Sequence, residues 1–386
     1  MSGPIDEPPL VTRVEPTPTA RPRPGLVGAI LWSVLFMLVL LGALVCVGGV
    51  VLAVHAVGKP NPGQFIEDQL KGFVQAAQPA VPGGPPAPRP PIEMSQALAY
   101  GMLGAQIASL CFALLVLRQL VGVDWKRQIA IRKPYPLHLL LVALVVPAVI
   151  LVSSAIQELV VKLAGRTPSA PEAVLGELFH AVPVWVTLLS VSIGPGVVEE
   201  LWCRGYLGRG LCARYGLPAG ILFTSMLFAA MHGDPWRIVV YTCMGGFLHF
   251  VYLASRSLWT SIVLHLLNNG IAVLMAVLPS WQQFEQELEK DSAGLLPVIY
   301  VASLALLIFA SVALWTGRAK LVCLKHTEST DGTSWQPEYP AISLPPPGMN
   351  AAVAYSPMSR VAMILTLVSF GVLVFLLSRV AVAAPA

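Results

Sequence analysis

Three short polar motifs stand out in an otherwise apolar chain, and the first is "VVEELWCRGY", residues 197–206. It places two adjacent carboxylates, Glu199 and Glu200, just before Arg204. Glu200 and Arg204 are four residues apart, so on a helix they share a face and can pair. Glu199 is rotated about 100° around the helix axis and faces a different neighbour. The spacing therefore predicts one ion pair and one carboxylate that is left for another task.

The other two motifs are "FAAMH", residues 228–232, and "HLLNN", residues 265–269. His265 and Asn269 are one helical turn apart inside an apolar run, where contact with lipid is unfavourable for both side chains. They can hydrogen-bond across helices and hold a bundle together, or they can take part in catalysis. His232 ends a short apolar run, where a histidine is as often simply hydrated as functional.

Together, the Glu, His, His and Asn side chains of these motifs could hydrolyse a bond with water. A carboxylate removed from water has a raised pKa and can act as a general base near neutral pH. A histidine can share that proton or bind a metal ion, and a histidine with an asparagine can donate hydrogen bonds to a developing oxyanion. The residue types permit hydrolysis without requiring it.

The elements that must position these residues are membrane-spanning helices. Of the 386 residues, 56% are hydrophobic and 11% are charged, and the mean hydropathy is +0.73. The apolar runs are continuous rather than alternating, which favours helices. The sequence predicts an all-α polytopic bundle of eight or nine spans. We place nine apolar runs at 26–54, 94–117, 137–161, 182–198, 217–231, 238–254, 258–278, 295–315 and 361–379.

The charges between these runs predict how the chain crosses the membrane. If the N-terminus is cytoplasmic, the cytoplasmic loops carry more than twice as many lysines and arginines as the outside loops. This is the direction that the positive-inside rule requires. We therefore expect a multi-pass protein of the cell membrane with a cytoplasmic N-terminus. The net charge of +4 follows from this asymmetry and does not indicate nucleic-acid binding, and no cysteine falls in an outside loop.

Composition also divides the chain into segments. A Pro- and Arg-rich tail is expected to be disordered, and an N-terminal membrane extension contains the Pro-rich sequence "QPAVPGGPPAPRPP". The motifs lie in a compact membrane core, and a two-span C-terminal extension contains a polar loop at 318–360. The predicted segments are 1–25, 26–134, 135–280 and 281–386.

Read in order, "EELWCR", "FAAMH" and "HLLNN" resemble the motifs EExxxR, FxxxH and HxxxN of the CPBP family of intramembrane proteases. That family includes the CAAX prenyl endopeptidases and bacteriocin-processing proteins. The resemblance covers roughly residues 135–280. It implies that Glu199 activates a water molecule together with His232 and that His265 and Asn269 stabilise the oxyanion. Glu200 and Arg204 would then be mainly structural.

The resemblance leaves the cofactor open. Glu199, His232 and His265 would make a three-ligand zinc site with an open position, or the glutamate would activate water without a metal. The glutamate cannot easily be both ligand and base. Two further polar residues, Cys203 and His249, are interpreted as packed side chains.

The leading hypothesis is a membrane endopeptidase whose substrate is a membrane-associated peptide or protein in the lipid bilayer. A catalytically silent scaffold or immunity protein, using the polar cluster to pack helices, is the alternative. An ion carrier fits less well because the other spans carry few acidic residues.

The predicted spans contain one conflict. They place Glu199 near the cytoplasmic edge, whereas His232 lies about 22 Å deeper at about 1.5 Å per residue. One water molecule cannot contact groups at such different depths. Either the predicted boundaries are wrong, or "IGPGVV", with Gly194, Pro195 and Gly196, breaks the helix and lets the glutamate segment sit inside the protein.

Overall fold

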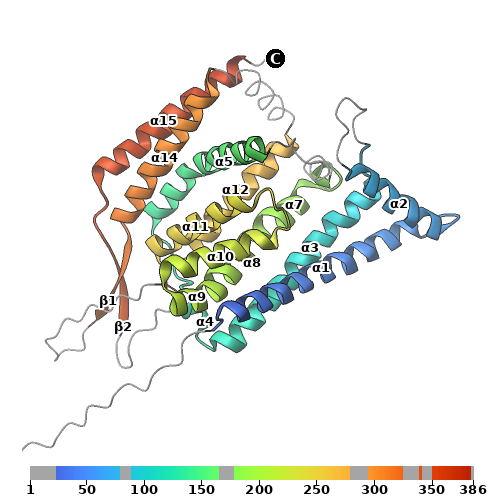
Figure 1. Ribbon diagram of the computed structural model, residues 1–386, viewed down its shortest axis with the longest axis horizontal. Helices are drawn as coiled ribbons and strands as arrows, with labels where there is room; N and C mark the ends of the chain where they lie inside the picture. The colour runs from blue at the N-terminus through green and yellow to red at the C-terminus, as the bar shows by residue number, and fades with distance from the viewer. Residues whose placement is uncertain are drawn as a thin grey trace, which may run out of the picture.

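A computed structural model describes residues 23–78, 88–164, 178–278, 294–324, 339–340 and 350–383. Within these residues the protein is a bundle of long helices with one small two-stranded sheet (Figure 1). In this described part of the chain, eight helices are long and apolar enough to cross a membrane. The prediction of an all-α polytopic bundle is therefore confirmed. The predicted disordered tail lies outside the described residues, apart from its last three positions.

An N-terminal helix pair, α1 (Leu26–Ala56) and α3 (Ile92–Val116), lies along one side of the bundle, with α2 (Pro62–Ala76) at its far end (Figure 1). Glycines bring the two backbones close together. A methyl group at Gly101 would lie 2.7 Å from the carbonyl oxygen of Leu44, and one at Gly48 would lie 2.9 Å from that of Ala97. Close approach at small residues is a common way to pack membrane helices, because no hydrophobic effect drives their association within lipid.

We expect Gly101→Val to lower the free energy of unfolding by about 1–3 kcal/mol, because the added side chain would push α1 away from α3. Thermal unfolding in detergent measures the effect. Gly49→Val is the matched control, because a side chain at Gly49 would enter open space. Equal effects of the two substitutions would contradict close packing at Gly101.

The helix that carries the first motif is continuous from Val184 to Tyr215. It consists of α7 (Val184–Thr187), η2 (Leu188–Ile193), α8 (Gly194–Glu200), η3 (Leu201–Leu207) and α9 (Gly208–Tyr215). The η segments are π-helical, with hydrogen bonds that reach five residues back. The predicted run at 182–198 therefore ended too early, and the Gly-Pro-Gly sequence does not break the helix. Because Glu199 lies halfway along this 32-residue helix, the conflict in depth came from a wrong boundary.

Five more long helices and one short one complete the bundle: α5 (Pro136–Ala164), α10 (Leu217–Met231), α11 (Ile238–Ser255), α12 (Leu258–Val277), α14 (Leu296–Thr316) and α15 (Arg360–Ala383). The predicted run at 217–231 is the short helix α10, whose 15 residues fall below the length of the eight membrane-spanning helices. Even so, α1 begins and α15 ends at opposite ends of the bundle (Figure 1). This is the arrangement expected from nine traverses, one of them short.

The remaining elements lie between spans. η1 (Leu117–Val121) and α4 (Trp125–Gln128) follow α3, and strands β1 (Ala319–Leu324) and β2 (Asn350–Tyr355) pair antiparallel between α14 and α15. The region 318–360 was predicted as a polar loop, so this pair of strands was missed.

The N-terminal helix pair packs against the back of the helix that carries the first motif. The indole of Trp202 in η3 stacks on Phe36 of α1, with ring centroids 4.7 Å apart, and lies 5.7 Å from Phe112 of α3. Trp202 is fully buried. The N-terminal helices thus hold one face of this helix, which also packs against α10 and α12 (Figure 1).

Candidate active site

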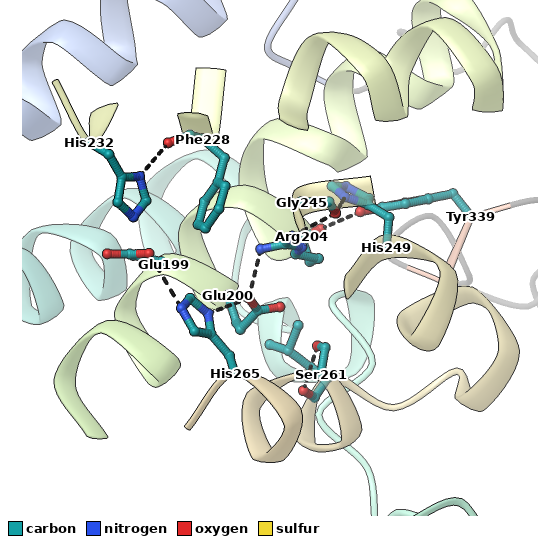
Figure 2. Close-up of polar contacts among 11 residues, drawn as sticks. Glu199, Glu200, Arg204, Phe228, His232, Gly245, His249, Ser261, His265 and Tyr339 are labelled. Carbon is teal, nitrogen blue, oxygen red and sulfur yellow. Dashed lines mark hydrogen bonds and ion pairs between the residues drawn. The ribbon is translucent and has the colours of Figure 1, made fainter. Parts of the chain in front are cut away.

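The ion pair expected from the spacing of Glu200 and Arg204 is present. Nη1 of Arg204 donates to Oε1 of Glu200 at 2.6 Å, and both side chains are fully buried. Nη2 of the same guanidinium donates to the backbone carbonyl of Gly245 on α11 at 2.8 Å (Figure 2). A buried charge needs both an opposite charge and hydrogen bonds, and this arginine has both.

His265 on α12 lies between the two carboxylates of the first motif. Its Nδ1 is 2.9 Å from Oε1 of Glu200, and its Nε2 is 3.8 Å from Oε2 of Glu199 (Figure 2). The first distance is a hydrogen bond and the second is not. Helical spacing predicted only the pair of Glu200 with Arg204, and the contact of Glu200 with His265 was missed. A single sequence carries no signal for a contact between residues 65 positions apart.

The Glu199 carboxylate is the one that takes no part in the ion pair with Arg204. Its side chain is 17% exposed, whereas that of Glu200 is fully buried. Among the described residues, Oε2 of Glu199 has no hydrogen-bond partner. A carboxylate oxygen without a donor is able to accept a proton from a water molecule.

His232 caps the C-terminal end of α10, and its position is exposed. Nδ1 of the ring is 2.8 Å from the carbonyl oxygen of Phe228, and the ring stacks on Tyr241 of α11 with centroids 4.1 Å apart. In Figure 2 the His232 ring points toward Glu199. The Phe228 ring packs edge-on against both histidines of the site, at 4.8 Å from the His232 ring and 5.9 Å from the His265 ring.

Asn269 lies one turn beyond His265, and its amide has a structural partner. Nδ2 donates to the carbonyl oxygen of Val191 at 3.1 Å. Val191 lies in η2, so this bond joins α12 to the π-helical turn that precedes the Gly-Pro-Gly sequence. An amide nitrogen has two N–H groups, so the second remains available for a substrate.

The donors proposed for zinc do not form a metal site in the described part of the chain. No three His, Cys, Asp or Glu side chains are placed there so that they could share one ion. Nδ1 of His265 is used by Glu200, and its Nε2 faces Glu199 at 3.8 Å. Because Glu199, His232 and His265 do not fit a three-ligand zinc site as placed, we assign no step of the chemistry to a metal.

Cys203 and His249 are packed side chains, as interpreted from the sequence. Both are fully buried, and Nδ1 of His249 is 2.9 Å from the carbonyl oxygen of Gly245, the same oxygen that accepts from Arg204. The three motifs led to the residues in the site, but Tyr241, which stacks on His232, carried no signal that could have identified it.

Comparison with known proteins defines the class of protein to which this site corresponds. Residues 181–271 match the family described as "Type II CAAX prenyl endopeptidase Rce1-like". This stretch contains all three motifs and every site residue described above. The resemblance to the CPBP family of membrane proteases is therefore confirmed over this part of the chain.

One relative is the Bacillus subtilis (strain 168) protein named "Putative membrane peptidase YdiL". It is 28% identical over 123 residues, which make up 32% of this chain and 49% of that protein. The chain thus spans about half the length of the curated relative that it matches. No solved structure matches.

Proposed function

We propose that the protein is an intramembrane endopeptidase in which Glu199 activates a water molecule for attack on a peptide bond. The observation that carries the proposal is the position of His265 between two carboxylates. One is paired with Arg204, and the other has no hydrogen-bond donor on Oε2 among the described residues. The match to a family of membrane endopeptidases supports it.

The charges of the site suit this chemistry. When His265 carries both ring protons, Glu199, Glu200, Arg204 and His265 sum to zero net charge. A neutral group of charges is the least costly to bury, because each charge has an opposite partner. In this state Nδ1–H of His265 donates to Glu200, and Nε2–H is available to a developing oxyanion.

In the proposed reaction, Glu199 removes a proton from water as the oxygen attacks the carbonyl carbon of the scissile bond. His232 approaches the same carboxylate from α10 and helps to hold the water. Nε2–H of His265 and the second amide N–H of Asn269 donate to the oxyanion. Collapse of the tetrahedral intermediate breaks the C–N bond, and the proton held by Glu199 passes to the leaving amine.

The substrate class follows from the position of the site. The carboxylates lie halfway along a membrane helix, so the substrate we propose is a membrane-associated peptide or protein segment. The excess of lysine and arginine in the predicted cytoplasmic loops supports a cytoplasmic N-terminus in the cell membrane.

The test is the loss of His265. We expect His265→Ala to lower cleavage by about a hundredfold or more, because the oxyanion loses a donor and Glu200 loses a partner. Cleavage is measured by mass spectrometry of new protein N-termini in membranes of cells expressing the wild type or the variant. This measurement works even when the substrate has not been identified.

His138→Ala is the matched control. His138 is also fully buried, but its ring bonds to the carbonyl of Gly317 instead of to the site. Expression levels of the variants must be equal. If new N-termini persist with His265→Ala, the endopeptidase proposal fails and the non-catalytic scaffold becomes the better explanation.

A further inference from the structure

One tyrosine from the region between β1 and β2 is buried in the bundle, far in sequence from the three motifs. Tyr339 has no exposed surface, and its hydroxyl donates to the backbone carbonyl of Arg204 at 3.0 Å. Its ring lies 5.4 Å from that of Tyr252 and 6.0 Å from that of His249, both on α11. The residue is labelled in Figure 2 on the Arg204 side of the site.

The carbonyl of Arg204 needs this donor because the helix changes its hydrogen-bond register there. The N–H of Gly208 bonds to the carbonyl of Cys203, five residues back, and α9 begins at Gly208. Where a π-helix passes into an α-helix, the register shifts by one residue and one carbonyl is passed over. A buried carbonyl without a donor is costly, and the Tyr339 hydroxyl supplies that donor at Arg204.

The space for this hydroxyl depends on a glycine. A methyl group at Gly208 would lie 2.3 Å from the Tyr339 hydroxyl oxygen, which is far too close for two atoms that are not bonded. Burial also raises the pKa of the Tyr339 hydroxyl well above its usual value, so the group keeps its proton and remains a donor. The small residue at 208 and the hydroxyl at 339 thus fit one another.

We propose that Tyr339 is a positioning residue for the peptidase site, because its hydrogen bond to Arg204 holds η3 in the π register. That register fixes the direction in which Arg204 points. Arg204 pairs with Glu200, and Glu200 in turn holds His265. The proposal rests on the proposed function, and it assigns part of the site to a residue outside the stretch that matches the peptidase family.

Tyr339→Phe tests the proposal, because it removes only the hydroxyl. Two quantities are measured on the full-length protein in detergent or nanodiscs: cleavage, as new N-termini, and alkylation of Cys203 by a thiol reagent, quantified by mass spectrometry of its peptide. Cys203 is fully buried in η3, so alkylation reports a change of register there without depending on activity. We expect alkylation to rise and cleavage to fall by about tenfold each.

Two further variants test whether the effect comes from the contact between Tyr339 and η3. Tyr252→Phe is the matched control, because Tyr252 is equally buried but its hydroxyl donates to Ile129 instead of to η3. It should leave Cys203 protected. Gly208→Ala should reproduce the effect of Tyr339→Phe, and the double variant should lose little more than either single one, because both changes break the same contact.

Unchanged alkylation in Tyr339→Phe overturns the proposal, and so does increased alkylation with full cleavage. If instead the wild type and Glu199→Gln give the same N-termini, the peptidase function itself has failed. The alkylation measurement still shows in that case whether Tyr339 holds the register of η3.

Discussion

Glu199→Gln is expected to reduce cleavage by about a hundredfold to ten-thousandfold, the usual contribution of a general base. The amide keeps the shape of the side chain but cannot accept the proton of the attacking water. The protein should fold as before, because Oε2 of Glu199 accepts no hydrogen bond among the described residues. The measurement is the yield of new N-termini in membranes, together with the thermal unfolding temperature in detergent.

Glu158→Gln provides the matched control for this change. Glu158 is also a carboxylate on a membrane helix, α5, but it pairs with Lys162 at a partly exposed position. It should retain full cleavage. Cleavage that survives Glu199→Gln while it is lost with His265→Ala would show that another group is the base.

Arg204→Met should be the most destabilising single change in the site. It leaves the Glu200 carboxylate fully buried without its guanidinium, and the loss of one partner of a buried pair typically costs about 3–5 kcal/mol of unfolding free energy. The same substitution at Lys71, which pairs with Glu67 at the same spacing on an exposed surface, should cost at most about 1 kcal/mol. Unfolding by denaturing detergent or heat measures both. Equal costs at the two positions would show that the Glu200–Arg204 pair is not buried as described.

A second substitution separates stability from catalysis. Adding Glu200→Gln to Arg204→Met removes the buried unpaired charge, so part of the stability should return. Cleavage should not return, because Nδ1 of His265 has then lost the Glu200 carboxylate that holds it. A double variant that regains both properties would show that Glu200 has no part in positioning His265.

The local part of the site could be predicted from the sequence, because helical spacing alone determines it. The pair Glu200–Arg204 follows from a separation of four residues, and the structure contains it. The contact of Glu200 with His265 and the packing of Tyr241 on His232 depend on how separate helices meet. Spacing within one helix carries no information about such contacts. The catalytic roles of Glu199, His232, His265 and Asn269 stay predictions.

The errors in the predicted fold have physical causes. Gly194, Pro195 and Gly196 usually end helices, but here they lie between two π-helical segments of one helix that continues to Tyr215. The region 318–360 was interpreted as a loop from its polar composition. Composition alone predicts neither the strand pair nor the burial of Tyr339. In each case the structure depends on contacts with residues far along the chain, and the local sequence does not show these contacts.

The short helix α10 has a consequence for the membrane around the site. Its 15 residues extend about 22 Å, whereas the hydrocarbon core of a bilayer is about 30 Å thick. Thinning of the bilayer beside the helix is one of the ways in which such a mismatch is relieved. Because His232 caps the end of α10, thinning there would bring the water interface toward His232. A membrane-associated segment could then reach the Glu199 carboxylate from the thinned surface, without crossing the full depth of the lipid.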